Sequence, residues 1–267
     1  MYIERIQIEN IRGFESVDLD LTRPDGSYAG WTVLAGRNGS GKSTLLRAIA
    51  LAVTGPPDVK ALQESFADWL RRGTQRGETA LSLQPPWHAR DLGSISLGLS
   101  WHSYPESLSE PMLSFDIVKR KRSETEILVR GPWNPSFPQS SSPWFLAGYG
   151  PFRRLTGHGK DAQRLMSGPD RLARLASLFR EDASLVECVE WLQDVYVRRL
   201  EGKPGAAELE QVVLDLLNDG LLPDGARVDH VDSDGLWVEI EGCTLPLGSL
   251  SDGYRTTAAL VMDIVRH

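Results

Sequence analysis

The sequence has 267 residues, 41% hydrophobic and 24% charged, which is the composition of a globular protein with one large core or two modest lobes. Its net charge of −7 argues against a surface that is basic throughout, but leaves room for a local basic groove. It contains no apolar run of the roughly 20 residues that a membrane-spanning helix needs. The two cysteines, Cys188 and Cys243, are far apart and are expected to be reduced, buried thiols. We therefore expect a cytoplasmic protein that does not contact the membrane.

Two strands in hairpin order are predicted first. Apolar and polar residues alternate over residues 2–14, which end in Asn10-Ile-Arg-Gly-Phe14, and again over residues 16–22. A turn rich in Pro, Asp and Gly follows at residues 23–27.

The next stretch, residues 36–44, reads Gly-Arg-Asn-Gly-Ser-Gly-Lys-Ser-Thr and fits the phosphate-binding pattern of Gly, four residues, then Gly-Lys-Ser. Residues 31–35 are predicted to form a short buried strand before it, and residues 43–52 a helix after it. Glycines let the backbone approach phosphates, and the N–H groups at the helix start face the anion. A Gly/Ser-rich turn that matches by chance is the weaker alternative. The sequence therefore predicts a nucleoside triphosphate site.

The candidate ligands of ATP and Mg²⁺ all come from this loop. Lys42 would neutralise the β and γ phosphates, and the Ser43 hydroxyl would join the magnesium shell as the candidate metal ligand. The residues expected to bind the nucleotide are Gly36, Asn38, Gly39, Ser40, Gly41, Lys42, Ser43 and Thr44.

Downstream of the loop the hydrophobic period changes several times. A second helix is predicted over residues 58–72, and about four antiparallel strands over residues 78–130. The basic turn at residues 119–124 either contacts phosphates or, more simply, is a solvated hairpin tip. Residues 131–143 are expected to be a Pro-rich loop or linker, and residues 144–151 a short buried strand.

The last third is predicted to be largely helical. Three helices are expected between residues 170 and 220, one of them opened by a capping box of Ser184 and Glu187 and the last closed by Gly220. A hairpin follows at residues 227–240.

Residues 247–255, Leu-Gly-Ser-Leu-Ser-Asp-Gly-Tyr-Arg, lead into an apolar helix over residues 256–267. Ser251 can cap this helix and offer a hydroxyl group, and Gly253 allows a ligand close to the backbone. The segment therefore has the layout of a second helix start that faces phosphate. An ordinary helix N-cap is the alternative.

Residues 10–14, 36–44 and 250–255 together resemble the ABC superfamily of ATPases, in the compact SMC/RecF/OLD-like branch that lacks a long coiled coil. The resemblance implies an α/β fold: a P-loop ABC-type lobe with a mixed sheet around the P-loop helix, an antiparallel β subdomain and a helical subdomain. The expected parts are the N-terminal strands, loop and helices (1–75), the antiparallel region (76–155), the helical subdomain (156–222) and the hairpin with the signature segment, residues 250–255, and its helix (223–267).

The resemblance also implies a mechanism. Two copies would sandwich ATP, so that Ser251 and Gly253 of one protomer act in trans on the nucleotide held by the other, together with Lys42. Arg12 either lies near the nucleotide or is a surface arginine at a strand end. The partners implied are a second copy, DNA and a nuclease, in DNA repair or phage defence.

The sequence departs from the family in three ways. The acidic, magnesium-binding strand does not occur before His267, and Asp263 is interpreted as part of the preceding helix, so we expect an N-terminal portion of a longer protein that alone does not hydrolyse ATP. The Gln that senses the γ-phosphate has no clear counterpart; residues 149–154 are its best candidate position. Third, only short helices occupy residues 155–220, where SMC proteins insert coiled coils.

The alternative function is a nucleotide-gated interaction module with little or no hydrolysis.

Overall fold

The computed structural model describes residues 2–28, 30–84, 94–102, 112–121, 124–132, 145–150, 165–166, 168, 170–180, 186–222 and 225–267. The chain divides into two compact units, Met1–Leu146 and Ala147–His267. The phosphate loop belongs to the first unit and the signature segment to the second. Each unit is described by itself.

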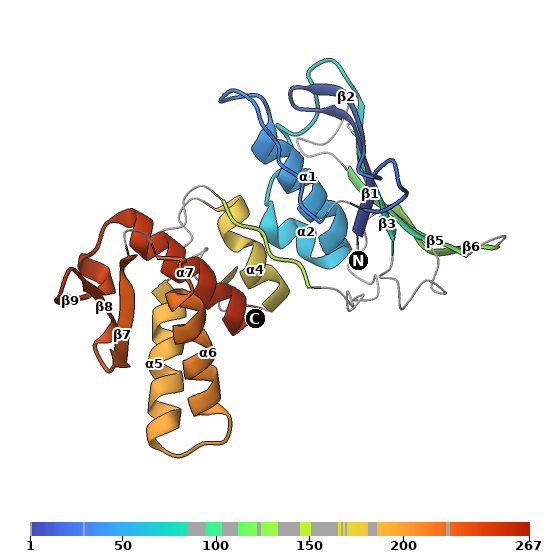
Figure 1. The fold of residues 1–267 in the computed structure, drawn as a ribbon. Coiled ribbons are helices and arrows are strands. Elements are labelled where there is room, and N and C mark those ends of the chain that lie inside the picture. The colour runs from blue at the N-terminus through green and yellow to red at the C-terminus, as the bar shows by residue number, and fades with distance from the viewer. Residues whose placement is uncertain are drawn as a thin grey trace. The chain divides into compact units, whose positions relative to one another are not determined.

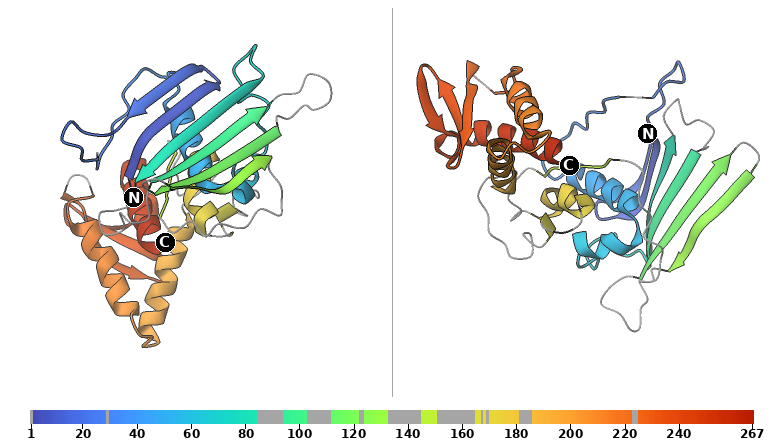
Figure 2. Two further views of the ribbon diagram at one scale, coloured as in Figure 1. Left: turned by 90° about the vertical axis from the view of Figure 1, so that its right-hand side faces the viewer. Right: turned by 90° about the horizontal axis from the view of Figure 1, so that it is seen from below.

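A six-stranded sheet organises the first unit (Figures 1 and 2). Its order is β2-β1-β3-β4-β5-β6, and the described neighbours pair antiparallel throughout. The strands are β1 (Tyr2–Ile11), β2 (Phe14–Asp20), β3 (Arg76–Gln84), β4 (Ser94–His102), β5 (Met112–Lys121) and β6 (Glu124–Pro132). The predicted N-terminal hairpin and the four later strands therefore belong to one sheet, and the expected boundary after residue 75 does not separate two sheets.

Two helices, α1 (Lys42–Thr54) and α2 (Pro56–Leu62), lie on one face of this sheet (Figure 2). α1 buries Leu45, Ala48 and Leu51, which recur at helical spacing. The predicted helix after the loop is thus confirmed. It ends at Gly55, whose φ of 82° takes the backbone out of the helix.

The predicted helix over residues 58–72 is wrong beyond α2. The chain becomes extended at Gln63, and residues 69–71 bond to the turn between β1 and β2 instead of continuing a helix. The Arg12 amide donates to the Trp69 carbonyl at 2.8 Å, and the Arg71 amide donates to the Asn10 carbonyl at 3.0 Å. Phe66 and Trp69, two of the apolar residues in this pattern, are fully buried. Its period was not helical.

The expected buried strand at residues 31–35 is also wrong. The segment is extended, but among the described residues no ladder includes it. Trp31 is 89% exposed and Val33 85% exposed, whereas Leu34 is half-buried. A strand needs a neighbour for its N–H and C=O groups, and sequence pattern alone does not supply one.

The second unit combines helices with a small sheet (Figure 1). Its helices are α4 (Asp170–Phe179), α5 (Val186–Leu200), α6 (Ala206–Asn218) and α7 (Asp252–Arg266). The sheet has the order β7-β8-β9, formed by β7 (Arg227–Asp232), β8 (Gly235–Ile240) and β9 (Cys243–Pro246). A single cluster of buried side chains from α5, α6, α7 and the sheet forms its core. The predicted helices and hairpin are confirmed; β9 was not predicted, because four residues carry too little alternation to be recognised.

The remaining expectations from the sequence have mixed outcomes. Residues 145–150 form no strand, which corrects the expectation for residues 144–151 within its described part. Cys188 is buried as expected, but Cys243 is exposed, and both are free thiols. Gly220 has a φ of 77° just after α6, as its predicted role requires. Ser184 lies outside the described residues, as do residues 122–123 at the tip of the predicted basic turn and residues 151–154.

Candidate functional site

The phosphate loop takes the backbone conformation that its glycines allow. Gly39 has a φ of 80° and Gly41 a φ of 89°, values that side chains disfavour. Gly41 is the N-cap of α1, so the helix starts at Lys42 and its unpaired N–H groups point toward the loop. A Cβ atom at Gly36 would lie 2.7 Å from the Ser40 hydroxyl oxygen. Gly36 and Ser40 therefore approach each other too closely for a side chain at position 36.

The Lys42 ammonium group lies inside the loop. Its Nζ donates to the carbonyl oxygens of Gly36 at 2.7 Å and Arg37 at 2.8 Å. Ser43 is exposed in the first turn of α1, and Asn38 and Ser40 are exposed beside it, while Thr44 is half-buried. A cation held by two loop carbonyls, next to a free helix start, is a suitable environment for a phosphate anion. Lys42 and the first amides of α1 could therefore hold an anion, and Ser43 is exposed next to them.

The turn between β1 and β2 touches this loop. The Phe14 ring packs against Gly41 so closely that a Cβ there would lie 2.5 Å from the ring. Two residues earlier, Arg12 has a φ of 48°, an uncommon value for a residue with a side chain. Such strained positions persist where neighbouring contacts hold them, and they often mark functional sites. The structure therefore connects the sequence motif at residues 10–14 to the phosphate loop through Phe14.

Several contacts fix Arg12. Its guanidinium lies 4.9 Å above the centre of the Trp69 ring and donates from Nη2 to Asp68 Oδ2 at 2.8 Å. Arg71 holds the same turn by donating from Nη1 to the Gly13 carbonyl at 3.0 Å. A pocket of about 760 Å³ opens here. Its lining residues are Arg12, Ala67, Asp68, Leu70, Arg71 and Arg72. The sequence did not predict that residues 67–72 line a pocket with Arg12, because their apolar pattern indicated a helix.

The signature segment forms an exposed helix start in the second unit. Ser251 is the N-cap of α7 with extended backbone angles, and its side chain makes no capping hydrogen bond. Ser251 and Gly253 are both exposed, as a role toward a ligand requires. Arg255 secures the turn by donating to the Gly248 carbonyl at 3.4 Å and by pairing with Asp252. The Ser251 hydroxyl and the first amides of α7 are therefore open to a partner.

The interior of the second unit holds a polar group that the sequence did not single out for function. Asp263, correctly expected to be a helix residue, is buried in α7, where it accepts hydrogen bonds from the Tyr149 hydroxyl at 2.7 Å and the Cys188 thiol at 3.4 Å. Burial, the negative charge of Asp263 and these hydrogen bonds raise the pKa of both Tyr149 and Cys188. Its two donors come from distant parts of the sequence, so no local signal predicts the network.

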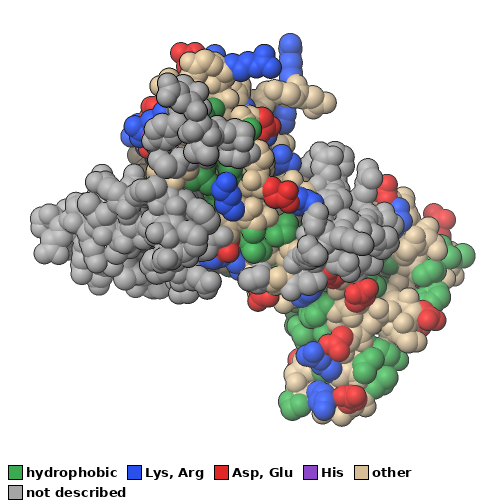
Figure 3. Space-filling view, turned by 180° about the vertical axis from the view of Figure 1, so that it is seen from behind, with side chains coloured by type: hydrophobic (Ala, Val, Ile, Leu, Met, Phe, Trp, Pro, Cys, Tyr) green, Lys and Arg blue, Asp and Glu red, His purple; other side chains and the backbone are tan. Residues whose placement is uncertain are grey.

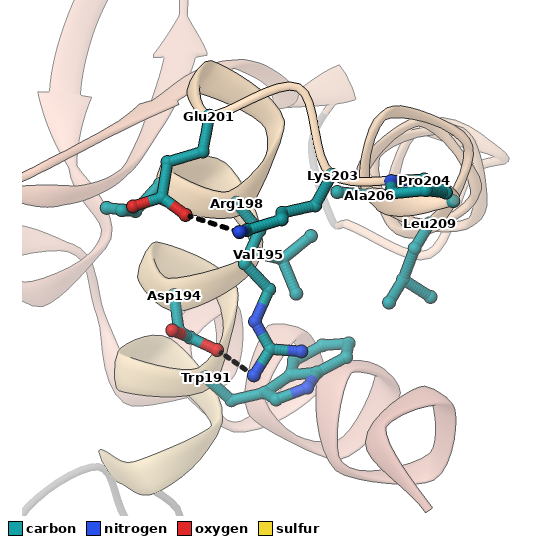
Figure 4. A pocket seen from close by; sticks show the side chains of 11 residues that line it. Trp191, Asp194, Val195, Arg198, Glu201, Lys203, Pro204, Ala206 and Leu209 are labelled. Carbon is teal, nitrogen blue, oxygen red and sulfur yellow. Dashed lines mark ion pairs between the residues drawn. The ribbon is translucent and has the colours of Figure 1, made fainter.

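A further pocket, of about 550 Å³, lies between α5 and α6 (Figure 4). Its charges are paired within it: Arg198 with Asp194 at 2.7 Å, and Lys203 with Glu201 at 3.6 Å. The pocket therefore carries as many carboxylates as cations, and without an excess of positive charge it is a poor phosphate site. On the face drawn in the space-filling view, acidic and basic side chains of the described residues are interspersed (Figure 3). This mixture agrees with the expectation from net charge.

Among the described residues, no group of three or more His, Cys, Asp or Glu side chains is arranged to hold a metal ion. Of the described helices, none combines the length and the apolar character needed to cross a membrane.

Residues 5–81 match a family described as AAA domain. The Septu protein PtuA of Bacillus mycoides is 25% identical over 268 aligned residues, covering 99% of this chain and 31% of PtuA. The DNA replication and repair protein RecF of Gloeobacter violaceus is 31% identical over 84 residues, covering 32% of this chain and 20% of RecF. A solved structure of the recombination mediator protein RecF with ATP is 11% identical, with a TM-score of 0.36, and the match covers 99% of this chain and 79% of that one. The matched regions thus span 31% and 20% of the two curated relatives.

Proposed function

We propose that this chain is an ATPase-type domain of the SMC/RecF-like kind and that it binds ATP with Mg²⁺ through residues 36–44, which lie within the region that matches the AAA domain family. The observation that carries the proposal is the Lys42 ammonium group, held by the Gly36 and Arg37 carbonyls at the N-terminus of α1. An ATP phosphate entering the loop would gain this cation and the free amides of the helix start.

Each residue has a defined part in the proposed site. Lys42 neutralises the terminal phosphates, the loop amides from Gly39 to Ser43 donate hydrogen bonds, and the Ser43 hydroxyl binds Mg²⁺. The ion, when bound, spreads the negative charge of the β and γ phosphates. Arg12 is included in the proposed site as a second cation, because the turn that carries it contacts Gly41 through Phe14. Binding would therefore depend on charge neutralisation by residues far apart in the sequence.

We further propose that two copies close around the nucleotide. The exposed Ser251 hydroxyl and Gly253 backbone of one copy would contact the phosphates held by the loop of the other. This closure would serve as a switch for DNA or for a partner nuclease. The relatives give the context: RecF is named for DNA replication and repair, and PtuA as a Septu protein.

A nucleotide-gated interaction module with little hydrolysis is the second candidate function. It is favoured by the position of Asp263, the carboxylate that follows an apolar run in the last helix. That carboxylate is buried and accepts hydrogen bonds from Tyr149 and Cys188, so it is not available to activate water. Under this alternative, ATP changes the affinity for a partner without being consumed.

Calorimetric titration of the chain with Mg-ATP tests the proposal. Lys42→Ala should weaken binding by about 10- to 100-fold, since it removes a charged hydrogen-bond donor. Lys203→Ala, which removes the same charge in the second unit, is the matched control and should bind as the wild type does. Unchanged ATP affinity in Lys42→Ala would refute the assigned site. Phosphate release measured in parallel separates the two functions: turnover supports the ATPase, and binding without turnover supports the gated module.

A further inference from the structure

The pocket at the turn between β1 and β2 contains more positive than negative charge. Arg12, Arg71 and Arg72 line it, together with one carboxylate, Asp68. That carboxylate forms an ion pair with Arg12, with 2.8 Å between Asp68 Oδ2 and Arg12 Nη2. The pair occupies the Nη2 donor that Arg12 would otherwise offer to an anion.

The two partners of this ion pair are held very differently. Arg12 is only 27% exposed, lies over the Trp69 ring and has its amide bonded to the Trp69 carbonyl. The Asp68 side chain is 71% exposed. Asp68 can therefore rotate into solvent at little cost, whereas Arg12 stays in place. An incoming anion would replace the carboxylate without moving the cation.

Carboxylate and phosphate groups bind a guanidinium through the same planar fork of N–H donors. The Arg12 turn also reaches the phosphate loop, because Phe14 packs on Gly41. We propose that Asp68 is an internal competitor that occupies the phosphate position of Arg12 in the empty protein and so weakens nucleotide binding. This inference rests on the proposed function, and it assigns the regulation of that site to a residue outside the phosphate loop.

The competition has a characteristic dependence on phosphate. Removing the Asp68 charge frees Arg12 for the nucleotide, so binding of ATP and ADP becomes tighter. Adenosine has no phosphate to contact Arg12, so its binding does not change. The gain also requires Arg12, and it disappears in an Arg12→Gln background. A role of Asp68 in folding alone would produce neither dependence.

The experiment titrates ATP, ADP and adenosine into the wild-type chain and into Asp68→Asn, which keeps the shape and removes the charge. We expect ATP to bind about two- to fivefold more tightly to the variant, as an exposed ion pair would allow. Asp68→Glu keeps the negative charge, so this variant should bind ATP with the wild-type affinity. Asp18→Asn is the matched control: its carboxylate is also exposed and paired with an arginine, Arg5, on the first two strands. It should leave ATP affinity unchanged.

Unchanged or weaker ATP binding by Asp68→Asn would overturn the inference. An equal gain in Asp18→Asn, for adenosine, or in the Arg12→Gln background would also overturn it. The same titrations distinguish failure of this inference from failure of the proposed function. If the wild type binds ATP through Lys42 and Asp68→Asn changes nothing, only the competition is refuted. If the wild type binds no ATP, both proposals fall.

Discussion

The Tyr149 hydroxyl donates a 2.7 Å hydrogen bond to Asp263, whose side chain is 1% exposed within α7. This bond joins the segment at residues 145–150 to the helix that starts at the signature segment. A buried carboxylate is stable only when donors replace its lost hydration. Tyr149 and Cys188 provide these donors. The network therefore links the position of α7 to residues that lie more than 70 positions earlier in the chain.

Tyr149→Phe removes one donor from this buried acceptor without changing the ring. We expect the variant to lose about 1–3 kcal/mol of stability, because Asp263 stays buried but loses the Tyr149 hydroxyl, one of its two hydrogen-bond donors. Urea denaturation followed by circular dichroism would measure the loss. Tyr196→Phe, on the half-exposed side of α5, should change stability by less than about 0.5 kcal/mol. Equal midpoints for Tyr149→Phe and the wild type would contradict the importance of this bond.

The buried Cys188 thiol predicts a pH dependence of stability. Burial, followed by the charge and hydrogen bond of Asp263, raises its pKa above the ordinary value of 9.0. As the pH rises through about 9, the unfolded thiol loses its proton and the native thiol keeps it, so the native state binds more protons and stability falls. Cys188→Ala should make the free energy of unfolding less dependent on pH in this range. A pH profile identical to that of the wild type would be evidence against the raised pKa.

Alkylation offers an independent check of the same environment. Iodoacetamide should modify the exposed Cys243 in the native protein and Cys188 only after denaturation, since the thiolate is the reactive form. Mass spectrometry of the labelled peptides distinguishes the two sites. Equal labelling of both cysteines under native conditions would contradict the burial of Cys188.

Gly150 is predicted to tolerate no side chain. A Cβ atom there would overlap the backbone carbonyl of Ser177 in α4, which cannot move like a flexible side chain. Gly150→Ala should therefore cost about 1–3 kcal/mol through forced backbone displacement. At Gly248 a Cβ would meet nothing within 4 Å, so Gly248→Ala is the control and should be close to neutral. Thermal unfolding of the two variants compares them directly; similar melting temperatures would refute the close packing at Gly150.

Ser251→Arg tests the proposed closure of two copies. Ser251 is exposed and makes no capping bond with its side chain, so the substitution should leave folding and ATP binding largely intact. A large cation at the proposed contact with the partner's nucleotide should block dimer formation driven by ATP. Light scattering with and without Mg-ATP, beside the wild type, gives the answer. A variant that dimerises with ATP as the wild type does would show that the signature segment is assigned wrongly.

Much of the architecture could be predicted where the sequence pattern is local. The helix after the phosphate loop, the strands between residues 78 and 130, the hairpin at β7 and β8 and the helix after Ser251 all follow from hydrophobic period and glycine positions. The phosphate loop itself was identified because its glycines and Lys42 are contiguous. Local conformational preference and amphipathic period are properties of a short stretch, so a single sequence carries them.

What the sequence could not determine involves partners distant along the chain. Residues 31–35 have a strand-like pattern, yet pairing needs a neighbour, and none of the described residues provides one. Residues 67–71 resemble a helix, but backbone bonds to the turn at residues 10–12 hold them in another conformation and bring Asp68 to Arg12. Tyr149, Cys188 and Asp263 likewise meet only in the folded unit. Sequence alone determined the residues of the phosphate loop, whereas tertiary structure decided which residues pair with Arg12 and Asp263, because long-range hydrogen bonds and ion pairs leave no periodic signal.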